Sequence, residues 1–185
     1  MVKRAGGLCR EFLVFGTVFF CLLIVDLVIK YVSMGVVDVT FIPRFISFHY
    51  TQNRGVAFGW FYGAGLWLVF ISLVLIVVGS AIYILHRHKR KQTHGRAPKL
   101  LDIAFAFFLA GAVGNFFDRV FYGYVRDFIR FDFMNFPIFN LADVFINVGV
   151  LLLIVYILFF EWRKKKEPGI APVTVDTEEE DERND

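Results

Sequence analysis

Aspartates are the side chains in this sequence whose type and spacing could do chemistry. Six of them lie near the ends of long apolar stretches or in the segments that join those ends: Asp26, Asp38, Asp118, Asp127, Asp132 and Asp143. Two carboxylates held close together in a restricted site cannot both ionise easily, so one keeps a proton. Such a pair can activate water and protonate a leaving group, and the proton belongs to the pair. Spacing alone does not choose which two aspartates form it.

Other catalytic side chains fit less well. The four histidines all lie outside the long apolar stretches, which disfavours a haem-binding bundle and a histidine proton relay: His49, His86, His88 and His94. The sequence has no HExxH and no GxSxG motif, so a zinc protease and a Ser-His hydrolase are disfavoured. Cys9 and Cys21 are too few for a disulfide framework or a zinc cluster. A Ser-Lys arrangement that pairs Ser33 or Ser47 with Lys30 remains possible.

The elements that must position these residues are membrane helices. Of the 185 residues, 57% are hydrophobic, against about 45–50% in a soluble domain. Four stretches reach the roughly 20 apolar residues that a membrane helix needs, at about residues 12–33, 64–85, 100–122 and 139–160. The first carries Asp26 and Lys30 and lacks a small-residue cleavage site, so it is a retained span rather than a signal peptide. The sequence therefore predicts an all-α membrane protein with four transmembrane helices.

Basic residues set the expected orientation. They gather at the N-terminus, in the segment 86–99 and directly after the fourth span. Since positive charge stays inside, both termini should be cytoplasmic, and the loops at 34–63 and 123–138 should face outward. The bases thus act as topology determinants, and a nucleic-acid partner is not expected. Residues 167–185 hold eight acids and one base, which predicts a disordered cytoplasmic tail.

The first outward loop also carries strand signals. Residues 36–40 and 45–50 are β-branched and aromatic runs bounded by Pro43 and Gly55. We expect a small extracytoplasmic β element near the membrane surface.

Polar residues of the spans collect at their outer ends. Ionisable residues within membrane spans usually face the interior of the helix bundle or a water-filled site. The polar residues at the outer ends are Asp26 and Lys30 on the first span, Asn115, Asp118 and Arg119 on the third, and Asn140 and Asp143 on the fourth. Each group also has a structural interpretation: a satisfied ion pair four residues apart, an anchored helix end, and an N-cap with an acid in the first turn. Their common depth favours a shared site. Gly111 and Gly114 most simply allow close helix packing.

Two other functions remain open at this stage. A small ion- or proton-coupled transporter could use Asp26, Asp118 and Asp143, although none of these lies at mid-membrane, where such sites usually sit. A non-catalytic assembly protein could use the polar cluster to hold helices together, and it would tolerate Asp127→Asn.

Five short motifs in one order over about residues 20–150 carry a family resemblance. They are Asp26 with Lys30; Asn53, Gly55, Ala57, Phe58 and Gly59; Gly111, Gly114, Asn115, Asp118 and Arg119; Val125, Asp127 and Phe128; and Phe139, Asn140, Ala142, Asp143 and Ile146. Together they resemble lipoprotein signal peptidase (signal peptidase II), the aspartic peptidase family of bacterial inner membranes. Leu27 and Ala110 depart from the family's usual residues, outside its catalytic positions.

The resemblance selects a dyad and a reaction. It implies that Asp127 and Asp143 are catalytic, and that ten further residues bind substrate or support the site: Asn53, Arg54, Gly55, Asn115, Asp118, Arg119, Asn140, Ala142, Asp26 and Lys30. Asp118 with Arg119 would position the loop that carries Asp127. The implied substrate is a diacylglyceryl-modified prolipoprotein, cut just before the lipidated Cys, with membrane lipid as surroundings and with neither metal nor cofactor. Residues 1–166 would form the peptidase domain, in the bacterial inner membrane with its active site near the outer surface. The sequence leaves the oligomeric state open, with a monomer as the simplest expectation.

Overall fold

The computed structural model describes residues 2–35, 38–55, 65–94 and 99–161. Four helices carry the apolar stretches: α1 (Val2–Ser33), α2 (Gly65–His94), α3 (Lys99–Tyr122) and α4 (Leu141–Tyr156), the last continued by a π-helical turn, η2 (Ile157–Glu161). All four are long and apolar enough to cross a membrane. The predicted membrane fold with four spans is confirmed. The helices α1 and α2 also continue into the basic segments beyond the predicted spans.

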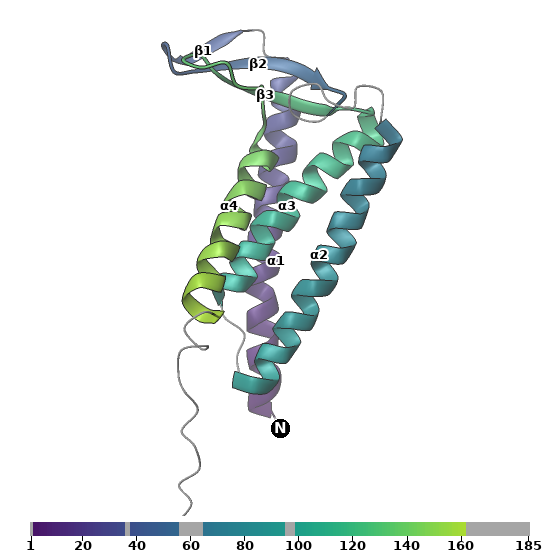
Figure 1. Cartoon of the computed structure of the whole chain (residues 1–185), viewed down its shortest axis with the longest axis vertical. Coiled ribbons are helices and arrows are strands. Elements are labelled where there is room, and N and C mark those ends of the chain that lie inside the picture. The colour runs from purple at the N-terminus through teal and green to yellow at the C-terminus, as the bar shows by residue number, and fades with distance from the viewer. Residues whose placement is uncertain (1, 36–37, 56–64, 95–98, 162–185) are drawn as a thin grey trace, which may run out of the picture.

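Helix α3 lies at the centre of the bundle and packs against α4, α1 and α2 (Figure 1). Glycines permit the closest of these contacts. A Cβ atom on Gly111 would lie 2.2 Å from the backbone oxygen of Ala142, and one on Gly149 would lie 2.5 Å from the backbone nitrogen of Phe108. Since no side chain fits in that space, α3 and α4 approach with their backbones almost touching, as small residues allow in membrane bundles.

A three-stranded antiparallel sheet lies across one end of the bundle (Figure 1). Its strands are β1 (Val39–Ile42), β2 (Ile46–Asn53) and β3 (Val125–Phe131), and β2 is central. The first two strands correspond to the expected β element, although residues 36 and 37 lie outside the described residues. The third strand corrects the prediction that 123–138 is only a loop. Its segment forms a strand because it pairs along β2, with Asp127 opposite Thr51.

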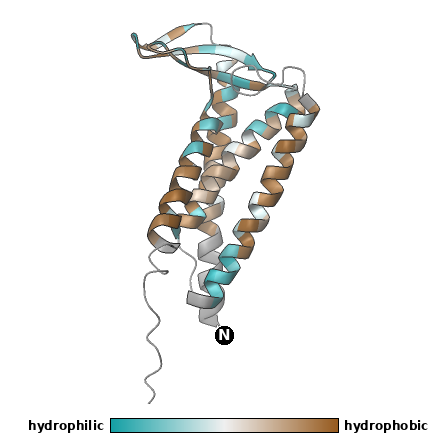
Figure 2. Ribbon diagram, in the orientation of Figure 1, coloured by the Kyte–Doolittle hydropathy of each residue, from teal (hydrophilic) through white to brown (hydrophobic). Residues whose placement is uncertain are grey.

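The middle parts of the helices consist mostly of apolar residues, and polar residues collect toward the sheet and the opposite end (Figure 2). Most large apolar side chains of α2 are exposed, as expected for a helix in contact with lipid. Far from the sheet, the rings of Phe15, Tyr83 and Phe105 stack between three helices. Beside them Tyr83 and Arg87 donate to the buried carboxylate of Asp102. The acidic segment 167–185 lies outside the described residues.

Candidate active site

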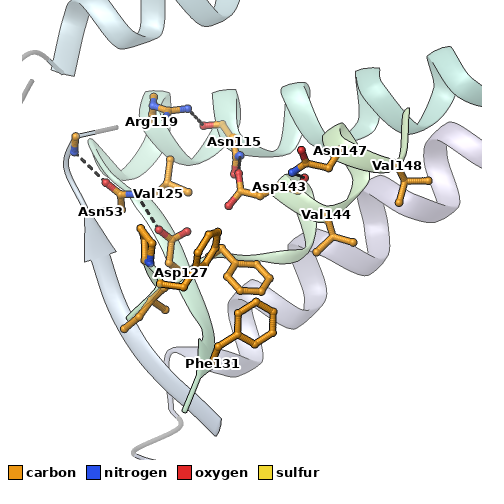
Figure 3. Close-up of a pocket in the computed structure, with 15 residues that line it drawn as sticks. Asn53, Asn115, Arg119, Val125, Asp127, Phe131, Asp143, Val144, Asn147 and Val148 are labelled. Carbon is orange, nitrogen blue, oxygen red and sulfur yellow. Dashed lines mark hydrogen bonds between the residues drawn. The ribbon is translucent and has the colours of Figure 1, made fainter. Parts of the chain in front are cut away.

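A cavity of about 540 Å³ opens between the sheet and the sheet-facing ends of α3 and α4. Its polar wall contains both aspartates that the resemblance selects, Asp127 and Asp143 (Figure 3). Its other polar residues are Asn53, Asn115, Arg119 and Asn147. The remaining wall is mainly apolar: Val125, Phe131, Phe136, Pro137, Ile138, Phe139, Val144 and Val148. An apolar cavity with a few convergent polar groups is the usual form of a substrate site.

Asp127 enters the cavity from strand β3. Its side chain is almost fully buried, with 1% exposed. Asn53 Nδ2 on the neighbouring strand donates to its Oδ2 at 2.9 Å, and Asn140 Nδ2 donates to its Oδ1 at 2.6 Å. Burial, reinforced by the nearby charge of Asp143, raises the pKa of Asp127 from 3.8 to about 7, against the opposing effect of the two amides and of Lys30. This carboxyl therefore titrates near neutral pH.

Asp143 enters the same cavity from the first turn of α4. Asn140 is the N-cap: its side-chain oxygen accepts from the Asp143 backbone N–H at 3.1 Å, and Asp143 Oδ2 accepts from the Asn140 backbone N–H at 3.2 Å. This reciprocal capping box satisfies two free N–H groups of the helix start. The capping interpretation of this pair is therefore correct. It also fixes the carboxylate of Asp143 at the cavity wall.

Two amides connect the dyad. Asn115 Nδ2 donates to Asp143 Oδ1 at 2.8 Å, while Asn115 Oδ1 accepts from Asn140 Nδ2 at 3.2 Å. Lys30 Nζ also donates to Asn115 Oδ1, at 2.9 Å. Because two donors occupy its oxygen, the Asn115 amide can only present its nitrogen to Asp143. The network thus leads from a buried lysine through two amides to both carboxylates.

A buried ion cluster lies directly behind this network. Lys30 Nζ lies 2.9 Å from Asp26 Oδ2 and 3.5 Å from Asp118 Oδ2. Arg126 binds Asp118 through its side chain at 2.7 and 3.1 Å and through its backbone N–H at 3.0 Å. Two acids and two bases cancel formally, which lowers the cost of burying charge. The predicted pair of Asp26 and Lys30 is present.

Gly114 makes room for this cluster. A Cβ atom at Gly114 would lie 2.4 Å from Asp26 Oδ2. The carboxylate of Asp26 therefore occupies the space that the side chain of any larger residue at position 114 would fill.

The resemblance implied that Asp118 and Arg119 act together to position the segment that carries Asp127, and in the structure the two residues have different partners. Asp118 holds Arg126 instead, so it contacts the strand that carries Asp127 one residue before that aspartate. Arg119 points to the cavity wall, where its NH1 donates to the backbone oxygen of Asn115 at 3.4 Å. Adjacent residues on a helix diverge by about 100°, which explains why one of them faces the ion cluster and the other the cavity.

The remaining predicted site residues occupy different places. Asn53 Oδ1 accepts from the Gly55 backbone N–H at 3.0 Å, and both residues line the cavity. Arg54 is exposed, bonds Gln52 at 3.5 Å and does not line the cavity. Ala142 is fully buried, and its backbone packs against Gly111 of α3. The motif residues 57–59 lie outside the described residues.

Sequence reasoning missed two residues of this region. Arg126 was passed over because its partner, eight residues earlier, lies on a different element. Asn147 was passed over although it follows Asp143 by one helical turn and so shares its face. Within the described ranges, no group of three or more His, Cys, Asp or Glu side chains could hold a metal ion.

Comparison with known proteins identifies the family of this chain. The family model for signal peptidase (SPase) II matches residues 18–159. The lipoprotein signal peptidase of Clostridium tetani is 41% identical over 133 residues, covering 70% of this chain and 80% of its own, and that of Microcystis aeruginosa is 41% identical over 140 residues, covering 72% and 84%. A solved structure of a bacterial membrane enzyme superposes with a TM-score of 0.69 at 27% identity, covering 85% of this chain and 94% of its own. The chain therefore belongs to the signal peptidase II family of membrane aspartic peptidases.

Proposed function

We propose that this peptidase removes the signal peptide of prolipoproteins and that Asp127 and Asp143 are its catalytic dyad. The observation that carries the dyad is that Asn140 connects the two carboxylates: its side chain donates to Asp127, and its backbone N–H donates to Asp143. Both carboxylates line one cavity. The transporter and assembly alternatives have no comparable support. Neither of them requires Asn140 to connect the two carboxylates or Asp127 to line a cavity.

The dyad works by sharing one proton. One ionised carboxylate removes a proton from water, whose oxygen attacks the scissile carbonyl carbon, while the protonated carboxyl donates to the carbonyl oxygen. A proton then passes to the leaving amine as the C–N bond breaks. The pKa of Asp127 near 7 supports this residue as the carboxyl that holds the proton at rest. The amides of Asn53, Asn115 and Asn140 keep the two carboxylates in position during these steps.

The substrate would be cut just before a diacylglyceryl-modified Cys. The apolar cavity wall next to the dyad, with Phe131, Phe136 and Phe139, supports an occupant that combines a peptide with lipid chains. The sheet end of the bundle would face outward, at the headgroup level of the inner membrane, with both termini cytoplasmic.

The test is cleavage of a prolipoprotein peptide by the purified protein in detergent, followed by mass spectrometry of the products. The substrate is offered with and without the diacylglyceryl group. We expect a single cut before the modified Cys, in the lipidated substrate only. Folded protein that cuts neither substrate, or cuts at another bond, would contradict the proposal.

A further inference from the structure

Asn147 is a polar side chain in an otherwise apolar part of α4. Apart from Asp143 and Asn147, residues 141–155 are apolar or glycine. Its side chain is exposed and lines the active-site cavity. It lies one turn from Asp143, about 6 Å further along the helix from the sheet, and Figure 3 shows the two side chains as neighbours on α4. A carboxamide at this depth faces surroundings with little water to hydrogen-bond it.

The hydrogen bonds of Asn147 are only partly used. Its Nδ2 donates to the backbone oxygen of Asp143 at 2.8 Å. An asparagine side chain has two N–H donors and an oxygen with two lone pairs. Among the described residues, one donor is therefore occupied, and the oxygen and the second N–H have no protein partner. The bond to Asp143 holds the amide in place, so the oxygen is a fixed acceptor at the cavity wall.

Helix packing does not explain this residue. Asparagine side chains that hold membrane helices together bond across to a neighbouring helix. Asn147 instead bonds its own helix and remains exposed. Asn147 lines the same cavity as the dyad, together with the apolar residues Val144 and Val148.

From this geometry we infer that Asn147 binds the substrate backbone on the amino-terminal side of the scissile bond. The inference rests on the proposed peptidase function. A substrate strand in this cavity brings backbone N–H groups into a water-poor place, where each needs an acceptor. Asn147 Oδ1 supplies one. Because Asn147 lies deeper than Asp143, the strand that reaches it is the part that leads into the membrane, which is the signal peptide. The residue thus helps to set which bond lies at the dyad.

The test measures KM and kcat separately for the wild type and for Asn147→Leu, with the lipidated peptide as substrate. Substrates are also made in which one amide at a time, on the amino-terminal side of the cut, is replaced by an ester, which removes a single N–H. We expect Asn147→Leu to raise KM by about 5- to 20-fold with little change in kcat, the size expected for one hydrogen bond. One ester position should raise KM similarly for the wild type and have no further effect on the variant. That loss of a separate effect is the signature of a direct contact.

Controls separate this contact from a structural effect. Asn147→Val serves as a second apolar variant, and Val150→Ala changes an exposed α4 residue away from the cavity wall. Val150→Ala should keep the wild-type KM. Unchanged KM in both Asn147 variants, or ester effects that persist in them at every position, would overturn the inference. A wild type that cuts no substrate would instead contradict the proposed function.

Discussion

The side-chain amide of Asn140 donates a hydrogen bond of 2.6 Å to Asp127 Oδ1. The same residue caps α4, so the start of a membrane helix and a strand of the sheet meet at one carboxylate. The amide oxygen is used by the helix and the amide nitrogen by the active site. Capping of α4 and the proposed support of the dyad are therefore two uses of one side chain, and a substitution can affect them differently.

Asn140→Asp is such a substitution. The new carboxylate keeps an oxygen to cap α4, but it loses both N–H donors and places a negative charge beside Asp127. We expect the free energy of unfolding to fall by about 1–3 kcal/mol, because a buried acid replaces a hydrogen-bonded amide, while kcat falls by about 100-fold or more. The measurement is thermal unfolding in detergent beside cleavage kinetics. Asn140→Ala removes both roles and should lower both quantities. Equal activity of Asn140→Asp and wild type would show that the amide is not needed.

The pH dependence of cleavage should reflect the raised pKa of Asp127. Its proton is held below pH 7 and lost as the pH rises through about 7. Since the mechanism needs one proton on the dyad, kcat/KM should fall above that pH, with an apparent pKa that belongs to the pair. The Asn53 amide lowers the pKa of Asp127, so Asn53→Ala should shift this basic limb to higher pH. If the fall of kcat/KM in Asn53→Ala occurs at the same pH as in the wild type, or at a lower pH, Asp127 is not the group that titrates there.

The buried ion cluster should be more sensitive to the loss of one member than to the loss of a pair. Lys30→Met leaves Asp26 without its 2.9 Å partner and removes a donor from Asn115. We expect the free energy of unfolding to fall by about 3–5 kcal/mol. Adding Asp26→Leu should restore part of that loss, because it removes the uncompensated charge. A double variant less stable than Lys30→Met, measured by thermal unfolding in detergent, would show that the pair is stabilising in itself.

Gly114→Ala tests the space that Asp26 occupies. The added methyl would lie 2.4 Å from Asp26 Oδ2, so the carboxylate or the helix must move. We expect a loss of about 1–3 kcal/mol, the usual cost of overpacking. Gly16→Ala is the matched control, since its Cβ meets no atom within 4 Å. That change should be neutral or stabilising by up to about 1 kcal/mol. Equal unfolding temperatures for the two variants would contradict the close approach.

The four spans could be predicted from sequence because a membrane helix is a local pattern of about 20 apolar residues. The pair of Asp26 and Lys30 could be predicted for the same reason, since four residues make one turn. Strand β3 could not, because charged residues interrupt it at Arg126, Asp127 and Arg130, and it forms only by pairing with β2.

The partners within the site depend on tertiary structure. Asp118 was expected to act with its neighbour in sequence, Arg119, but it binds Arg126, which β3 brings to it. The bridging amide of Asn115 joins α1, α3 and α4. Contacts of this kind follow from how the elements pack, and no spacing rule within one segment could give them. The motif resemblance selected the candidate residues, and the structure supplies their contacts.

The central claim is that Asp127 and Asp143 share one catalytic proton. The most direct measurement is cleavage of the lipidated substrate by Asp127→Asn and Asp143→Asn, each shown to be folded by its unfolding temperature. Asp38→Asn, at an exposed position of the described chain, is the carboxylate control. The account predicts that both dyad variants lose cleavage by at least about 1000-fold and that the control retains it. Substantial cleavage by either folded dyad variant would contradict the account.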